Sequence, residues 1–383
     1  MRFPLRALCG SVLVMTASLT PTSLAAQASP DWGRIARAIV QRIAPEKGER
    51  VLLVGVPQMA DALVAPLRAA IRAAGAEDLG AMAASGATPS EWATTFTSGS
   101  AADANLGDVD VGVMLPGATP AHQPYAVLQR LLTAKGGRMR TIHFHWAGAY
   151  DMNGAVIDVT PERGALYQRA LLETDYAALS AIQQSFEQAM RANEVRVTTP
   201  AGTDIRFTIG DRPVTKQDGD ARGSRARQAR NLIDREIELP AGAIRVAPME
   251  ESVTGTIAFP RSRWGNEDVD GLVMRFERGR VVSLEARTGA GSVERELQGA
   301  GDAGRAFREF ALGFNPLLAI PKTGERWIPY YGYGAGVVRL SLGDNSELGG
   351  KVTGGYVRWN FFTDATVTVG REVWVRDGEL VRK

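Results

Sequence analysis

Cysteine is almost absent from this sequence of 383 residues, whose single cysteine is Cys9. From residue 10 onward the chain therefore has no internal disulfide bond, no thiolate nucleophile and no thiolate metal ligand. Histidine is nearly as scarce, with three in all, and none follows His145. The second half of the chain thus lacks any imidazole for metal binding or general acid–base catalysis.

Long hydrophobic runs and an excess of one charge are also missing. After the N-terminal segment, no stretch approaches the roughly 18 uninterrupted apolar residues of a membrane-spanning helix. The formal net charge is +2, far too small for the basic surface field that favours nucleic acid. We therefore expect neither a membrane nor nucleic acid among the partners. The sequence has no G-x-S-x-G motif either, which argues against a serine hydrolase.

Residues 1–28 have the organisation of a cleaved secretion signal. Arg2 and Arg6 form a short basic region, an apolar run follows over residues 7–19, and the segment ends in Ala26-Gln27-Ala28, a small-residue cleavage site. We predict that this signal peptide is removed on export to the periplasm or the medium; a retained membrane anchor is the alternative. Its arginines are its only charged residues, so the exported chain is formally neutral.

The chain after the signal begins with alternating helical and strand patterns. Residues 31–43 carry apolar side chains at helical spacing, and residues 51–54 form a short apolar run typical of a buried strand. This alternation predicts an α/β domain over residues 29–175, with helices packed on a mostly parallel sheet. We also predict helices over 60–74 and around 127–132, strands over 109–115 and 139–146, and a loop over 81–105.

From residue 176 the pattern becomes richer in β-structure. A connecting helix with Leu179, Ile182 and Phe186 on one face precedes a hairpin over residues 194–209. Residues 211–229 are polar and charged, which is typical of a mobile loop. We predict an α+β, β-rich domain over residues 176–383, with strands near 255–258, 272–276, 281–286, 337–342, 352–361 and 372–375, and one helix over 301–312.

Two histidines form a possible metal site in the first domain. His143 and His145 lie in a predicted strand, and alternation places both imidazoles on one face. With His122, Asp151 or Asp158 they would bind one transition metal. The alternative is that both are polar residues at a strand end, hydrogen-bonded near the boundary between the domains.

Several runs in the second domain resemble the thermophilic aminopeptidase (aminopeptidase T) family of metallopeptidases. Each run is short, but together they follow the family's order, and the resemblance extends over about residues 35–383. The runs include Val197-Thr198-Thr199-Pro200-Ala201-Gly202-Thr203-Asp204, Leu239-Pro240-Ala241-Gly242, Glu309-Phe310-Ala311-Leu312-Gly313 and Val375-Arg376-Asp377-Gly378-Glu379-Leu380. Gly48-Glu49-Arg50 and Gly75-Ala76 likewise resemble the family's N-terminal domain.

This resemblance implies a homodimeric exopeptidase in which two divalent ions, such as zinc, cobalt or manganese, hold a hydroxide and polarise the peptide carbonyl. It also implies where the metal ligands belong. Glu309 occupies one expected ligand position. A Glu is expected where Ala243 stands, a His at Arg339, a Tyr at Ser346, and a His-x-Asp pair at Arg358-Trp359-Asn360. Arginine does not ligate metals, because its guanidinium stays protonated.

Three functional hypotheses follow. The first is an aminopeptidase-like hydrolase that keeps activity with an altered metal site. The second, which we favour, is a metal-free relative that binds peptides or small zwitterions through Arg339, Arg358, Glu309 and Asn360, because the arginines restore the positive charge of the absent ions. The third is a single-metal enzyme built on His143 and His145. If none of these holds, the arginines only neutralise Glu309 and nearby acids.

Overall fold

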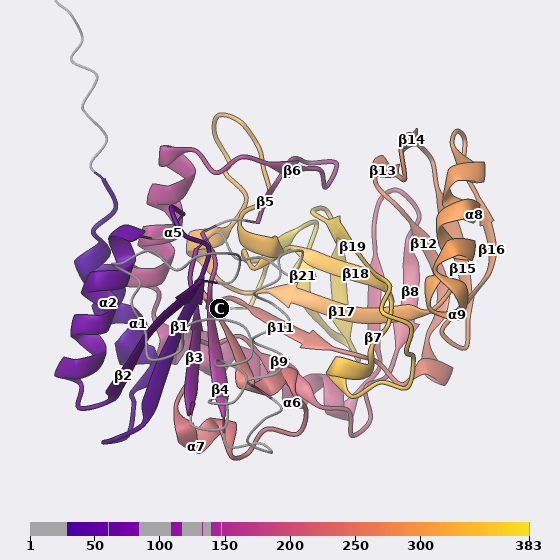
Figure 1. Cartoon of the computed structure of the whole chain (residues 1–383). Helices are drawn as coiled ribbons and strands as arrows, with labels where there is room; N and C mark the ends of the chain where they lie inside the picture. Colours follow the sequence, from indigo (N-terminus) through magenta and orange to yellow (C-terminus); the bar gives the residue numbers. More distant parts are fainter. Residues whose placement is uncertain are drawn as a thin grey trace, which may run out of the picture.

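The computed structural model describes residues 29–59, 61–83, 109–116, 132, 139–146 and 148–382. The predicted signal peptide, His122 and most of the loop predicted over residues 81–105 lie outside these residues. So does the helix predicted around 127–132, apart from residue 132. In the described part a sheet flanked by helices leads into a larger region built from antiparallel strands (Figure 1).

The first sheet is parallel throughout. Its strand order is β10-β4-β3-β1-β2, and every neighbouring pair runs in the same direction. The strands consist mainly of buried residues, as expected for a parallel sheet covered on both faces. They are β1 (Arg50–Gly55), β2 (Glu77–Ala83), β3 (Val111–Met114), β4 (Arg140–Phe144) and β10 (Glu236–Leu239).

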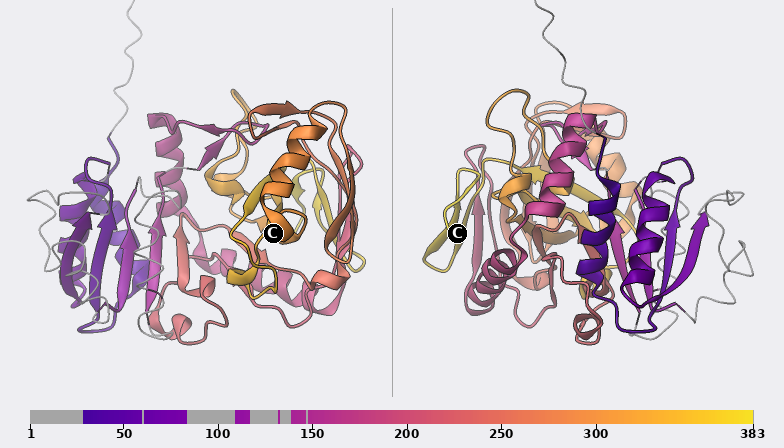
Figure 2. Two further views of the ribbon diagram at one scale, coloured as in Figure 1. Left: turned by 45° about the vertical axis from the view of Figure 1, so that its right-hand side comes forward. Right: turned by 90° about the vertical axis from the view of Figure 1, so that its left-hand side faces the viewer.

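Helices α1 (Trp32–Ile43) and α2 (Asp61–Ala73) pack side by side next to this sheet, at its indigo end (Figure 2). Asp31 caps α1 by accepting a hydrogen bond from the backbone N–H of Arg34. Helix α5 (Pro161–Glu173), which we did not predict, begins with Pro161 after the capping Thr160. Helix α6 (Tyr176–Ala192) matches the predicted connector. No helix in the described ranges is both long and apolar enough to cross a membrane.

The C-terminal region consists mainly of two antiparallel sheets. The five-stranded sheet has the order β19-β18-β17-β11-β9, with β9 (Val214–Lys216), β11 (Ala243–Val246), β17 (Phe307–Gly313), β18 (Val338–Gly343) and β19 (Val357–Phe362). The eight-stranded sheet has the order β16-β15-β12-β8-β7-β20-β21-β22. Its strands are β7 (Val195–Thr198), β8 (Asp204–Phe207), β12 (Thr254–Ala258), β15 (Val273–Glu277), β16 (Arg280–Glu285), β20 (Thr366–Val369), β21 (Glu372–Arg376) and β22 (Glu379–Leu380).

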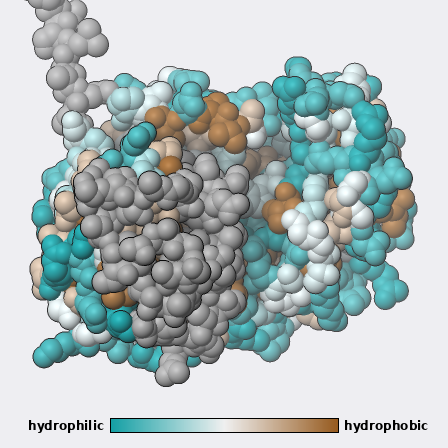
Figure 3. Space-filling view, in the orientation of Figure 1, coloured by the Kyte–Doolittle hydropathy of each residue, from teal (hydrophilic) through white to brown (hydrophobic). Residues whose placement is uncertain are grey.

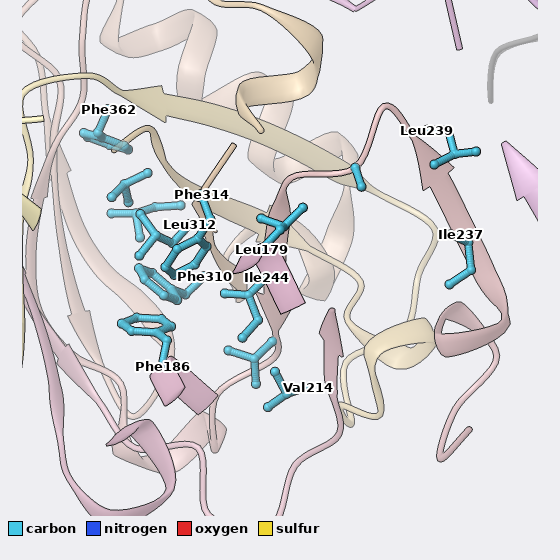
Figure 4. Packing of buried hydrophobic residues seen from close by; sticks show 14 of the residues in the cluster. Leu179, Phe186, Val214, Ile237, Leu239, Ile244, Phe310, Leu312, Phe314 and Phe362 are labelled. Carbon is cyan, nitrogen blue, oxygen red and sulfur yellow. The ribbon is translucent and has the colours of Figure 1, made fainter. Parts of the chain in front are cut away.

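The main core of this region packs against one face of the five-stranded sheet. Phe310 and Leu312 of β17 point into it together with Ile244 of β11 and Phe186 of α6 (Figure 4). On the outside, hydrophilic residues predominate in the view of Figure 3, notably over α8 (Ala290–Gly299) and the small β13–β14 hairpin (Ser262–Trp264, Glu267–Val269). The predicted α/β half and β-rich half are therefore confirmed.

Two sequence-based expectations in this region are wrong. The helix predicted over residues 301–312 is limited to α9 (Gly301–Gly304). Strand β17 follows it, and the residues of β17 are buried on both faces of the sheet. The polar segment 211–229 is not a featureless loop: it contains β9 and the short helix α7 (Gly223–Ala226). Residues 81–83 likewise belong to β2 and not to a loop.

Strand β10 joins the first sheet although it follows residue 176 in the sequence. Its neighbour β4 pairs with it from Thr141 to Phe144. The chain thus returns to the parallel sheet before it enters β11 of the antiparallel sheet. The domain boundary near residue 175 stays a prediction, and β10 is the element that links the two halves.

Candidate functional site

The two faces of the five-stranded sheet differ sharply in chemistry. Cross-strand partners share a face, and the register places Arg245 opposite Ala311, and Ala311 opposite Arg339. Glu309 lies opposite Ser341, which in turn lies opposite Trp359. Arginine, glutamate and tryptophan side chains from four adjacent strands therefore gather on one face.

Glu309 is the centre of this face. Its side chain is 0% exposed, and each carboxylate oxygen binds a different guanidinium. Arg245 donates from Nη2 to Oε2 at 2.9 Å, and Arg339 donates from Nε to Oε1 at 2.8 Å. A bulge between Phe307 and Glu309 also brings Arg308 Nε to 3.7 Å from Oε2. The carboxylate is thus held on both oxygens by charge-assisted hydrogen bonds.

The electrostatics follow from this burial. Burial alone raises the pKa of Glu309, but attraction to Arg245, Arg339 and Arg308 outweighs it and holds the pKa well below its usual range. Burial opposes the charge of Arg245 too, yet Glu309 raises the pKa of that guanidinium well above normal. Glu309 and Arg245 are therefore both ionised. Glu347 is the second acid of the cluster, pairing with Arg308 and lying 3.5 Å from Arg245.

Arg339 connects the charged cluster to a layer of aromatic rings. Its guanidinium lies 4.5 Å from the ring centroid of Trp359 and donates to the carbonyl oxygen of Tyr331 at 3.1 Å. Tyr331 has a φ of 56°, an outlier for a bulky residue. The indole N–H of Trp359 is buried and finds no acceptor among the described residues.

The aromatic layer is formed from both halves of the chain. Tyr331 packs edge-on against Trp359 at 5.5 Å between ring centroids and against Tyr150 at 6.1 Å. Tyr150 comes from strand β5 (Ala149–Tyr150) and lies 4.8 Å from the ring of Phe361. A side chain on Gly148 would collide with the ring of Tyr331, since an added Cβ would lie 2.7 Å from it. The close approach therefore requires glycine at this position.

This layer lies at the carboxyl end of the parallel sheet, the edge where open α/β sheets bind ligands. His145 follows β4 directly, and its ring is 5.5 Å from that of Tyr331. Tyr333 donates to the carboxylate of Glu238 in β10 at 2.5 Å. Burial raises the pKa of Tyr333, and Glu238 raises it further, so the hydroxyl keeps its proton.

Arg358 and Asn360 lie on the opposite face of β19. Leu342 faces Arg358 across the strand pair, and Leu340 faces Asn360. Arg358 binds Glu296 at 2.9 Å and stacks on the ring of Trp264 at 3.4 Å. Asn360 donates to the backbone carbonyl of Leu340 at 3.1 Å. The four predicted ligand-binding residues are therefore split into two pairs, and only Glu309 and Arg339 meet.

The residues around Glu309 that the structure describes do not provide the ligands that a pair of divalent ions needs. Both carboxylate oxygens bind arginine, Ala243 offers no donor, and Ser346 is hydrogen-bonded to Asp344. Throughout the described ranges, no three His, Cys, Asp or Glu side chains are grouped so as to hold a metal.

His143 and His145 do lie close together, with 5.6 Å between ring centroids. Both are buried, and Thr141 Oγ1 lies 3.2 Å from His143 Nε2. Burial lowers the pKa of His143, and His145 lowers it further, so His143 is neutral. Asp151 accepts from the backbone of its own turn. Because His122 lies outside the described residues, metal binding by this pair stays a prediction.

Arg245 and Trp359 are among the residues of this site that the sequence pattern did not lead us to predict. Arg245 lies two positions after Ala243, so strand alternation alone places the two on one face. An arginine between the buried Ile244 and Val246 is the signal that would have identified it. The sequence pattern marks Trp359 only as the residue between two expected ligands. The same alternation, however, places its side chain on the opposite face of the strand from Arg358 and Asn360.

No protein-family model matches this chain, and no curated protein matches it. Among solved structures, it is similar to 2,5-dihydroxypyridine dioxygenase from Pseudomonas putida KT2440, with a TM-score of 0.61, 15% identity, and coverage of 93% of this chain and 99% of that one. It is also similar to wild-type AmpT, an aminopeptidase T, from Thermus thermophilus, with a TM-score of 0.57, 17% identity, and coverage of 91% and 99%. At these identities the likeness establishes a distant aminopeptidase-like fold and nothing about activity.

Proposed function

We propose that this protein is an exported, metal-independent relative of aminopeptidase T that binds peptides or small zwitterions through their carboxylate, at Arg339 and Trp359. The proposal rests mainly on the ion pairs of the Glu309 carboxylate. Its two oxygens bind arginine side chains that are 3–4% exposed. In the two-metal chemistry that the sequence resemblance implies, those oxygens would bind cations instead.

Charge balance supports an anionic ligand. Arg245, Arg308 and Arg339 bring three positive charges to the cluster, Glu309 and Glu347 pair with them directly, and Glu238 acts on Arg245 without a direct ion pair. Three guanidinium groups thus share two directly paired carboxylates in a largely buried setting, which favours a further anion at Arg339. A ligand carboxylate would neutralise it and accept a hydrogen bond from the indole N–H of Trp359.

The aromatic layer supports a ligand of limited size. Tyr150, Tyr331 and Phe361 retain 7–8% exposure, and we propose that they form the apolar part of the site. The chain's own residues then have distinct roles: Arg339 and Trp359 bind the carboxylate, Glu309 and Arg245 hold Arg339 in place, and the rings contact the ligand's side chain. This arrangement binds and orients a ligand, and no bond cleavage is assigned to it.

The first test is metal content together with peptide binding. We expect the mature protein, incubated with zinc, cobalt and manganese and then desalted, to retain no stoichiometric metal by plasma mass spectrometry. Calorimetric titration should show that an unblocked dipeptide binds and that its C-terminal amide does not. Retention of about two ions per chain, with release of N-terminal residues from peptides, would replace this proposal by an active metallo-aminopeptidase with an altered site.

Trp359→Phe is the most discriminating variant, because it removes a buried N–H that has no acceptor while keeping a ring. If Trp359 is only packing, peptide affinity stays unchanged. If it binds the ligand, we expect a loss of about 3- to 30-fold, the equivalent of one hydrogen bond to a charged group. Arg358→Met is the matched control, because it removes a guanidinium from the other face of the same strand. Equal losses in both variants would contradict the proposed site.

Export and dimerisation are separate parts of the proposal. Cell fractionation should find the protein, shortened after Ala28, in the periplasm or the medium. Light scattering should give twice the mass of one chain for the homodimer. A cytoplasmic, uncleaved chain would contradict the export part of the proposal, and a monomer would contradict the dimer part. Neither result would bear on the binding site.

A further inference from the structure

A second polar cavity lies away from the arginine layer, between α6, β9 and α7. Its volume is about 370 Å³, within the range of small-molecule sites. Its walls carry five cationic side chains and four carboxylates. Much of one wall is the segment 211–229, whose charge pattern predicted a mobile loop. Arg222 and Arg225 of that segment instead line a cavity.

Most charges in this cavity are paired, but unevenly. Glu187 binds two cations, Arg191 at 2.6 Å and Lys216 at 2.8 Å. Arg225 pairs with Asp218, and Arg222 with Asp220 at 2.7 Å. The Glu187 end of the cavity therefore carries excess positive charge.

Asp234 is the opposite pole. It accepts from the hydroxyl of Thr215 at 2.9 Å and from the backbone N–H of Arg230 at 3.2 Å. No lysine or arginine of the described chain forms an ion pair with it. Arg230 instead pairs with Asp211, which is 92% exposed and lies outside the cavity lining. Burial raises the pKa of Asp234, and the two hydrogen bonds and the more distant charge of Arg225 only partly offset this.

Strand β9 connects the two poles. Thr215 binds Asp234, and the next residue, Lys216, binds Glu187. An anion alone would complement only the Lys216 end, and a cation alone only Asp234. A molecule that carries both charges complements both ends.

We propose that this cavity binds a small zwitterion, with its ammonium group at Asp234 and its carboxylate at Lys216 and Arg191. Both contacts are charge-assisted hydrogen bonds. A ligand of amino-acid size fits the volume. The site is independent of the arginine layer, since none of its lining residues belongs to that layer.

The test is a titration of the whole mature protein, followed by NMR saturation transfer, with glycine and γ-aminobutyrate as probes. Acetate and methylammonium, which each carry one of the two charges, serve as half-ligands. We expect at least one zwitterion to bind and the half-ligands to bind at least about tenfold more weakly, the equivalent of one lost charged contact. Equal binding of acetate or inorganic phosphate would overturn the proposal in favour of a plain anion site, and absence of any zwitterion binding would refute it.

Asp234→Asn locates the ammonium group. It keeps an oxygen acceptor for Thr215 but removes the charge, and we expect zwitterion affinity to fall about tenfold or more. Asp211→Asn is the matched control and should change affinity less than twofold. An unchanged Asp234→Asn variant contradicts the assignment. Trp359→Phe should leave the part of glycine binding that depends on Asp234 intact, which separates failure of this site from failure of the arginine layer.

Discussion

On one face of the five-stranded sheet, Phe310, Leu312 and Leu340 pack into an apolar core, while on the other face Arg245, Glu309 and Arg339 form a buried ionic cluster. The two faces are equally inaccessible to water, and the residues come from the same strands. Their energetics differ: the apolar face gains from removal of surface from water, whereas the ionic face must recover the desolvation of every charge through mutual attraction.

That difference explains why the ionic face is informative about function. A buried ion cluster is weak support for stability, because apolar residues of similar volume stabilise as well or better. The apolar face needs no ligand to explain it. The ionic face, with three guanidinium groups on two directly paired carboxylates and an indole N–H without an acceptor among the described residues, is the face at which we propose a ligand.

The largest effect is expected for Glu309→Gln. Removing the carboxylate leaves Arg339 buried without a direct counter-charge and Arg245 with only Glu347, 3.5 Å away, which costs about 3–5 kcal/mol. Urea unfolding at pH 7 measures it. Asp204→Asn, which loses an exposed pair with Arg196, is the control and should cost less than about 1 kcal/mol. Equal costs for the two variants would show that the buried cluster is not special.

On the apolar face, Leu312→Ala should cost about 2–5 kcal/mol through lost burial and the cavity left behind. Its cost should be the same at low and high salt, because no charge is involved. The same urea unfolding experiment, repeated in concentrated NaCl, tests this. A strong salt dependence would mean that the two faces are energetically coupled.

The pH dependence separates the faces further. Because the folded-state pKa of Glu309 is depressed, its stabilisation is fully present above the usual glutamate pKa of about 4.3 and is lost as the pH falls below it. The stability difference between wild type and Glu309→Gln should therefore be constant from pH 7 to about 5 and shrink on further acidification. The Leu312→Ala difference should show no such change between these pH values.

Replacing the whole ionic triad should cost less than breaking it. In the variant Arg245→Met/Glu309→Leu/Arg339→Met no uncompensated charge remains, so we expect stability within about 1–2 kcal/mol of wild type, or above it. Peptide binding, however, should be abolished. A triple variant as unstable as Glu309→Gln would indicate that the cluster is required for the fold itself.

The smallest effect is expected for Arg358→Met. This arginine contacts Glu296 and the ring of Trp264 but is partly exposed, so its loss should cost about 1 kcal/mol. Thermal unfolding measures it. A cost comparable to that of Glu309→Gln would place Arg358 in a network that its contacts do not show.

Local pattern was sufficient for much of the fold. Apolar spacing predicted α1, α2 and α6, and short apolar runs predicted β1, β3 and β4. It failed at residues 307–313, where a buried strand carries Arg308 and Glu309. Charged residues in a strand without clear alternation conceal its period, and only their partners on neighbouring strands make the burial possible.

The site was predictable in part. The family resemblance pointed to Glu309 and to Arg339, which meet in the structure. It also grouped Arg358 and Asn360 with them, although alternation along β19 separates these residues from Trp359. The spacing of residues in a sequence does not show which neighbouring residues a face of a strand contacts. That depends on the register of the sheet.

Composition and periodicity determined the absence of disulfides after Cys9, the lack of histidine after His145, and the order of the α/β and β-rich halves, because these depend on residue type and local spacing. The tertiary structure alone decided that Arg245 completes the cluster around Glu309, that β10 returns to the first sheet, and that segment 211–229 lines a cavity. Each of these depends on contacts between residues far apart in the chain, and strand register and packing select them only when the whole core is formed.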